Sequence, residues 1–136
     1  MSLKSQVSVE YMLIMGFVVI MTIPLIILYH SYTANSSDEI ITSQAKQIAN
    51  KIVDAAESVY FLGEPSQTTI KVYMPGKVVG ASLDNKEVVF NVSTISGISE
   101  IVEVSSVDLA GKLPVKGGVY SITLNATSTG VKISYK

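Results

Sequence analysis

Apolar residues follow three different patterns along this chain, and the patterns divide it into three parts. From Tyr11 to Ser37 there is no formally charged residue, and the run as far as Tyr29 is almost wholly apolar. From Ile41 to Leu62 apolar residues recur at intervals of three and four. In the remainder, apolar and polar residues alternate in short runs separated by Gly, Pro, Asn and Asp. The first two patterns are typical of helices and the third of strands.

The first apolar run is long enough to cross a membrane, since a spanning helix needs about 20 such residues. Lys4 precedes the run and Asp38 follows it, which favours a cytoplasmic N-terminus with the rest of the chain outside. The apolar region of a cleaved secretory signal is only about 7–15 residues long and ends in small residues. This run is longer and ends in Tyr29-His30-Ser31-Tyr32. We therefore expect residues 11–30 to remain in the mature protein as a transmembrane helix.

Pro24 lies inside this run. A proline cannot donate a hydrogen bond to the carbonyl four residues earlier, here that of Ile20, so a kink is predicted at this point. Membrane helices tolerate such prolines when their neighbours compensate. The kink needs no functional hinge to explain it.

The second pattern is the apolar stripe of an amphipathic helix. Gly63 followed by Pro65 is a typical C-terminal stop. Acidic residues favour a helix N-terminus, so Asp38 and Glu39 leave open a break near residues 36–37 instead of one unbroken helix over 6–62. The surplus apolar surface of such a helix needs other helices to cover it. The stripe consists of Ile41, Ala45, Ile48, Ile52, Ala55, Val59 and Leu62.

The third pattern predicts six short strands in a domain over residues 63–136, in an antiparallel sheet or small sandwich. Tyr120, Ile122 and Leu124 share one face of a strand, and Val131 and Ile133 suit the strand opposite. A glycine- and proline-rich loop is expected between the fourth and fifth strands. The fold class is thus α+β. The expected strands are 69–74, 78–83, 87–94, 100–107, 119–127 and 131–135.

Composition excludes several functions. The 136 residues include 10 Lys+Arg and 11 Asp+Glu, so the formal charge of −1 gives no electrostatic footprint for nucleic acid. The absence of cysteine excludes disulfides, zinc–thiolate sites and a cysteine nucleophile. His30 is the one histidine, and the carboxylates of the strand region are scattered singly. With no catalytic or metal-binding motif, we expect neither an enzyme nor a cofactor or metal.

The extreme N-terminus carries a more specific signal. Five residues, Met1 to Ser5, precede the sequence Gln6-Val7-Ser8-Val9-Glu10-Tyr11, which opens the apolar run. In this the chain resembles the archaeal type IV pilins that carry a class III signal peptide, whose short basic leader is cut before a Gln and whose retained helix opens with Q-x-S-x-E-Y. The resemblance covers roughly the first 75 residues. Ser5 stands where the family usually has Gly.

The resemblance implies cleavage between Ser5 and Gln6, which would remove the leader at residues 1–5 and create a new α-amino group on Gln6. Glu10 lies one helical turn from that amine. A carboxylate at the edge of a hydrocarbon layer is costly without a partner. In the family the partner is the amine of an incoming subunit, so Gln6, Glu10 and Tyr11 are the expected assembly residues. Alternatively, Glu10 is a solvated residue at the cytoplasmic face.

The function expected from the resemblance is structural. The chain would polymerise into an extracellular type IV pilus-like filament, with the helix in the core, the β domain outside and surface adhesion as its role. The implied partners are other copies of the chain, a prepilin peptidase, an assembly ATPase and a polytopic membrane platform protein. Two alternatives stay open: a single-pass membrane-anchored extracellular binding module, and the subunit of an archaellum-type motility filament.

Three N-x-S/T sequons begin at Asn35, Asn91 and Asn125. Asn91 lies on the strand face opposite Val88 and Phe90, and Asn125 alternates in the same way with its apolar neighbours, so both are expected to face solvent. With the expected outside location, this favours N-glycosylation at the three sites.

Overall fold

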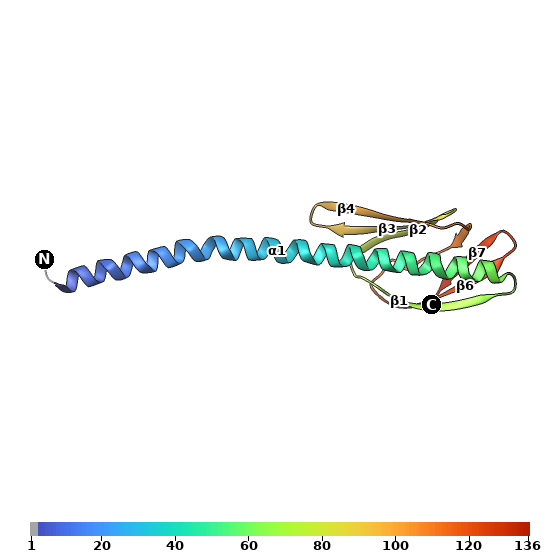
Figure 1. Cartoon of the computed structure of the whole chain (residues 1–136), viewed down its shortest axis with the longest axis horizontal. Helices are drawn as coiled ribbons and strands as arrows, with labels where there is room; N and C mark the ends of the chain where they lie inside the picture. Colours follow the sequence, from blue (N-terminus) through green and yellow to red (C-terminus); the bar gives the residue numbers. More distant parts are fainter. Residues whose placement is uncertain (1–2) are drawn as a thin grey trace. The chain divides into compact units, whose positions relative to one another are not determined.

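A computed structural model describes residues 3–136, with side chains described for residues 8–33 and 36–136 (Figure 1). One helix, α1 (Leu3–Leu62), is followed by seven strands, which confirms the α+β fold. The chain divides into two compact units, Met1–Ser37 and Asp38–Lys136. The second half of α1 therefore belongs to the same unit as the strands.

The helix runs through residues 36–37 without a break, so the alternative of a second helix starting near Asp38 is wrong. Asp38 does not act as an N-terminal helix residue. Instead, it lies in the helix interior and bonds to Lys77 and Ile95, which lie in turns next to the strands. The predicted C-terminal stop is confirmed: Gly63 has a positive φ of 77°, and its N–H donates to the Tyr60 carbonyl at 3.0 Å.

The strands form two sheets (Figure 1). One has the order β1-β6-β7-β5 and is antiparallel except for the parallel pair β5–β7, and the other is the antiparallel meander β2-β3-β4. The bounds are β1 (Gln67–Met74), β2 (Val78–Asp84), β3 (Glu87–Thr94), β4 (Gly97–Val104), β5 (Leu109–Gly111), β6 (Gly118–Thr127) and β7 (Gly130–Tyr135).

Two details differ from the sequence prediction. The short strand β5 lies where a loop was expected, because its parallel pairing with β7 depends on a distant segment and leaves no alternating pattern. Gly111 lets the two backbones approach closely, since a Cβ there would collide with the Ile133 carbonyl. In addition, β4 covers residues 97–104 instead of the expected 100–107, because Gly97 already pairs with Thr94 beyond a tight turn and the strand ends at Val104.

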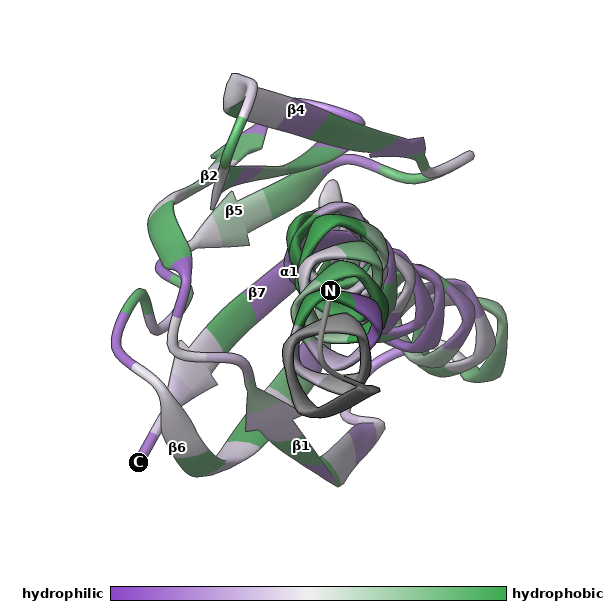
Figure 2. Cartoon of the chain, turned by 90° about the vertical axis from the view of Figure 1, so that its left-hand side faces the viewer, coloured by the Kyte–Doolittle hydropathy of each residue, from purple (hydrophilic) through white to green (hydrophobic). Residues whose placement is uncertain are grey.

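The core lies where the two sheets enclose residues 38–62 of α1 (Figure 2). From the predicted stripe, Ala45, Ile48, Ile52 and Val59 are buried, whereas Leu62 is 76% exposed. The buried face is wider than the stripe because each side of the helix meets a different sheet. The further buried helix residues are Ala49, Val53 and Ala56, and the strand residues around them include Val72, Met74, Val88, Phe90, Val92, Ile101, Ile122, Leu124, Val131 and Ile133.

Candidate functional site

The first half of α1 exposes its apolar side chains. Every residue from Ser8 to Thr33 is exposed, and the large apolar side chains range from 48% exposed at Met15 to 75% at Tyr32. The described part of the chain contains one helix long and apolar enough to cross a membrane. None of its most apolar stretch is buried within the chain. The segment is therefore a candidate membrane anchor.

Both threonine hydroxyls of this segment bond to its own backbone. Thr22 Oγ1 donates to the Val18 carbonyl at 2.7 Å, and Thr33 Oγ1 donates to the Tyr29 carbonyl at 2.9 Å. Such bonds to the preceding turn satisfy a hydroxyl without any external partner. The segment can thus enter an environment without water and leave neither threonine hydroxyl unpaired.

The motif residues lie at the N-terminal end of the same helix. The side chains of Ser5 and Gln6, at the expected cleavage site, lie outside the described residues. Glu10 and Tyr11 are both exposed and lead directly into the apolar segment. A carboxylate thus stands at the end of a long unpaired apolar surface, where a bilayer edge or a neighbouring chain could meet it.

Pro24 and His30 also lie on this exposed helical segment. The helix continues on both sides of Pro24, whose ring nitrogen has no hydrogen to donate to the Ile20 carbonyl. The predicted kink stays a prediction. His30 is exposed, as an interfacial residue would be.

The three sequons fall in different places. Asn35 lies outside the residues whose side chains are described. Asn91 on β3 stands opposite Glu100 of β4, and Asn125 on β6 stands opposite Gln67 and Lys132. Both asparagines are partly exposed, on the sheet faces away from the core. Their glycosylation stays a prediction.

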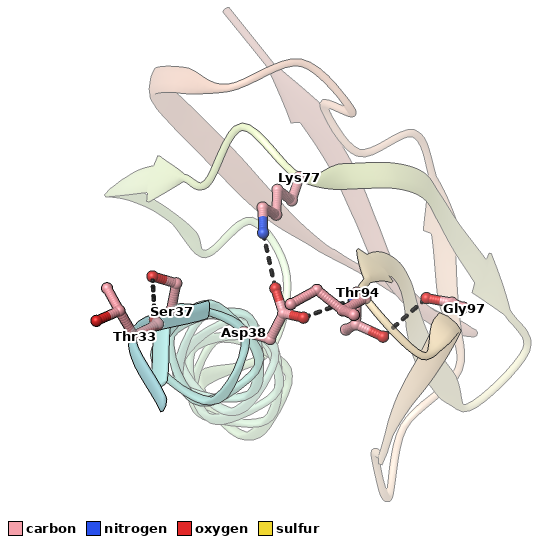
Figure 3. A network of polar contacts seen from close by, with 7 residues as sticks. Thr33, Ser37, Asp38, Lys77, Thr94 and Gly97 are labelled. Atoms are coloured by element: carbon pink, nitrogen blue, oxygen red, sulfur yellow. Dashed lines mark hydrogen bonds and ion pairs between the residues drawn. The ribbon is translucent and has the colours of Figure 1, made fainter. Parts of the chain in front are cut away.

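Asp38 anchors α1 to the β2-β3-β4 sheet, a role that the sequence analysis missed (Figure 3). Its carboxylate accepts a hydrogen bond from Lys77 Nζ at 2.7 Å and one from the backbone N–H of Ile95 at 2.6 Å. The Asp38 side chain is only 13% exposed. The pKa of Asp38 is lowered below its ordinary 3.8, mainly by the hydrogen bond from Lys77 and to a smaller extent by the one from Ile95.

Further polar contacts attach the same half of α1 to the strand region. Glu57 Oε1 accepts hydrogen bonds from the backbone N–H and the hydroxyl of Ser106, both at 2.8 Å, and these lower the pKa of Glu57 below its ordinary 4.5. Lys51 Nζ donates to the Lys71 carbonyl at 3.0 Å on β1. The partners are 20 or more positions apart, so no local sequence pattern reveals these contacts.

In the described part of the chain, no group of three or more His, Asp or Glu side chains is arranged to hold a metal ion. Three grooves of the described region are open, and the one beside the β2–β3 turn brings together Asp84, Glu87 and Asp108, which were expected to be scattered singly. A second distinctive feature is the exposed apolar helix with Glu10 at its end.

Comparisons of the chain with protein-family models, with curated proteins and with solved structures found no match.

Proposed function

We propose that the chain is the structural subunit of an extracellular type IV pilus-like filament. In the precursor, residues 11–30 cross the cell membrane with the N-terminus in the cytoplasm. After removal of residues 1–5, the helices of many copies pack together as the filament core, and the β domains coat its surface. Surface adhesion is the role that the resemblance suggests.

One observation carries this proposal, namely that residues 8–33 of α1 are exposed in a chain whose second helical half is well packed. Burying apolar surface stabilises an assembly by roughly 25 cal/mol per Å². A helix that is apolar on all sides belongs within a bilayer or among other helices. Helix bundling after membrane insertion uses both environments in turn.

The Q-x-S-x-E-Y motif supports the same proposal through its chemistry. Cleavage before Gln6 exposes an α-amino group with a reference pKa of about 7.7–8.0, positively charged in most molecules at neutral pH. Glu10 of a neighbouring copy would pair with that amine in the dehydrated core. The required partners are a prepilin peptidase, an assembly ATPase and a membrane platform protein.

The test compares Glu10→Ala with Glu39→Ala, which removes an exposed acid from α1 outside the apolar segment. Loss of a partner for a desolvated charge costs on the order of 1–3 kcal/mol, or about 5- to 150-fold at each subunit addition. Glu10→Ala should leave cleaved monomers in the membrane, whereas Glu39→Ala should form normal numbers of filaments by electron microscopy.

Normal filament numbers from Glu10→Ala would contradict charge pairing. If the unaltered chain stays in the membrane uncleaved and unassembled while its β domain is folded, then the alternative of a membrane-anchored binding module replaces the filament.

A further inference from the structure

Strand β4 has a free hydrogen-bonding edge. The Ser105 N–H donates to the Lys86 carbonyl at 2.6 Å, which continues the β3–β4 ladder and sets its alternation. In β4, therefore, the backbone N–H and C=O groups point to β3 at residues 97, 99, 101 and 103. At the residues between them, the same groups point away from β3. In the described part of the chain, no other backbone group bonds to these outward N–H and C=O groups. The four outward residues are Ile98, Glu100, Val102 and Val104.

The side chains of the same four residues form an exposed, largely apolar face. Ile98 is 72% exposed, Val102 42% and Val104 66%, and Glu100 is also exposed. Edge strands of soluble proteins are normally protected by lysines, prolines, bulges or short length. β4 is eight residues long, is regularly paired to β3 and has no lysine, proline or bulge, so Glu100 is the one charged side chain on its exposed face. It is therefore a template for the addition of another strand.

Strand β1 has the complementary edge. The Ala126 N–H donates to the Ser66 carbonyl at 2.9 Å, so residues 67, 69, 71 and 73 direct their backbone groups away from β6. The Lys71 carbonyl on this edge accepts the Lys51 ammonium. An open groove of about 280 Å³ lies between this edge and α1, lined by Gln44, Gln47, Ile48 and Lys51 of the helix and by Lys71, Val72 and Tyr73 of β1.

The remaining two edges are less suitable for a partner strand. β5 has only three residues, and β2 is interrupted by a bulge between Val78 and Gly80. The β2–β3 turn is also held to the start of β5, where the Leu109 N–H donates to the Asn85 carbonyl at 2.5 Å. The two long and regular edges are thus β4, which carries Glu100, and β1, which carries Lys71. The lysine protects β1 against a second β1 but suits an acidic strand.

We propose that β4 of one copy pairs antiparallel with β1 of the next copy, with Glu100 opposite Lys71 of the neighbouring copy. This register places Ile98 opposite Tyr73 and Val102 opposite Thr69 of that copy, so the outward backbone groups meet across the interface. The Lys71 carbonyl has two lone pairs and accepts from the partner strand as well as from Lys51. Pairing β4 with a second β4 would instead leave Glu100 of each copy without a lysine opposite it, because the other acid of β4, Glu103, lies on the opposite face and contacts Lys46 of its own chain at 3.7 Å. Charge complementarity therefore selects β1.

The contact joins two different surfaces, so it repeats head to tail from copy to copy, and it produces an open chain of subunits when the rotation between copies does not close into a ring. The strand contact rests on the filament function proposed above. It adds a contact between β domains to the packing of the helices, and it names the residues on both sides.

Engineered cysteines test the contact in the full-length chain, which has no cysteine of its own. Thr69→Cys and Val102→Cys are placed in two differently tagged chains that are expressed together and oxidised on the cell. Opposed strand residues have Cα atoms about 5.5 Å apart, within the range for a disulfide. The expected product is a mixed dimer. The control replaces Thr69→Cys by Ser134→Cys, an exposed position on β7, which has neighbours on both sides.

Charge reversal tests the register. Glu100→Lys or Lys71→Glu alone should reduce the mixed cross-link roughly tenfold, because repulsion replaces attraction in a cross-strand pair. Glu100→Lys in the Val102→Cys chain together with Lys71→Glu in the Thr69→Cys chain should restore it. Circular dichroism of each variant checks that the domain is folded.

Two results would overturn the inference. One is the absence of mixed dimers above the Ser134→Cys control, and the other is a predominance of Val102→Cys homodimers, which would mean that β4 meets β4. Electron microscopy of the same cells distinguishes a failure of the strand contact from a failure of the proposed filament. Filaments without the mixed cross-link reject the strand contact alone, whereas the mixed cross-link in membranes without filaments supports the contact and rejects the filament.

Discussion

The two halves of α1 are continuous in one helix but differ in what covers them. From Ser8 to Thr33 every side chain is exposed, although most are apolar. From Ala45 to Val59, in contrast, one face is buried by the two sheets and the other is polar. The periodicity of apolar residues thus indicates whether the partner of a helix lies within the same chain or outside it. A one-sided stripe predicts a partner within the chain, and an all-round apolar surface predicts one outside it.

The polar contacts of the two halves differ in the same way. In the first half, Thr22 and Thr33 bond only to the preceding turn of their own helix. In the second half, Asp38 and Glu57 reach the backbone and side chains of the strand region. Side-chain bonds to distant segments fix one half of the helix to its domain, whereas the first half keeps its whole circumference available.

The largest expected effect comes from truncating the same residue type in both halves. Ile52 is fully buried and Ile26 is exposed. Ile52→Ala should lower the free energy of unfolding of the β domain by about 2–5 kcal/mol, whereas Ile26→Ala should leave it unchanged. Denaturant unfolding of the full chain in detergent, followed by near-ultraviolet circular dichroism, measures both. Equal effects of the two substitutions would refute the conclusion that the second half of α1 is packed in the domain and the first half is not.

Glu57→Ala should have the next largest effect. It removes both hydrogen bonds to Ser106 and leaves the Ser106 N–H without its carboxylate acceptor. The matched control is Asp54→Ala, which removes an exposed acid from the neighbouring turn of α1. Thermal unfolding of the full chain should show a lower midpoint for Glu57→Ala than for Asp54→Ala. Identical midpoints would mean that the Glu57 contact does not stabilise the domain.

Acid should destabilise the β domain through the same anchors. The lowered pKa values of Asp38 and Glu57 mean that their contribution is present above their ordinary values of 3.8 and 4.5 and is lost as the pH falls through the lower folded-state values. The temperature midpoint of unfolding should therefore decrease as the pH is lowered below about 4.5. The double variant Asp38→Asn, Glu57→Gln should have a flatter dependence on pH. An unchanged slope in that variant would assign acid sensitivity to other groups.

The smallest effect on folding is expected from the sequons. Asn91→Gln and Asn125→Gln alter partly exposed positions on the outer sheet faces and should leave the unfolding midpoint nearly unchanged. If the sites are glycosylated, each substitution should remove one increment from the intact mass of natively expressed protein. A native mass equal to that of the peptide would show that neither site is used.

The sequence predicted the helix, its C-terminal end and most strands, because these depend on local periodicity and on glycine and proline. It did not predict β5, whose pairing partner β7 lies some 20 positions further along. Nor did it predict the anchors at Asp38 and Glu57, because an acidic residue on a helix looks the same whether it meets water or a distant backbone N–H. The exposed apolar segment could be predicted in full, since it depends on composition alone.

In the proposed filament, the first half of α1 is covered by other copies of the chain once its leader has been removed. To test this, native cells are sheared, the released material is examined by electron microscopy, and its N-terminal residue is determined. The expected result is filaments whose chains begin at Gln6, as glutamine or its cyclised form. Chains that begin at Met1 and stay in the membrane as single molecules would refute the filament.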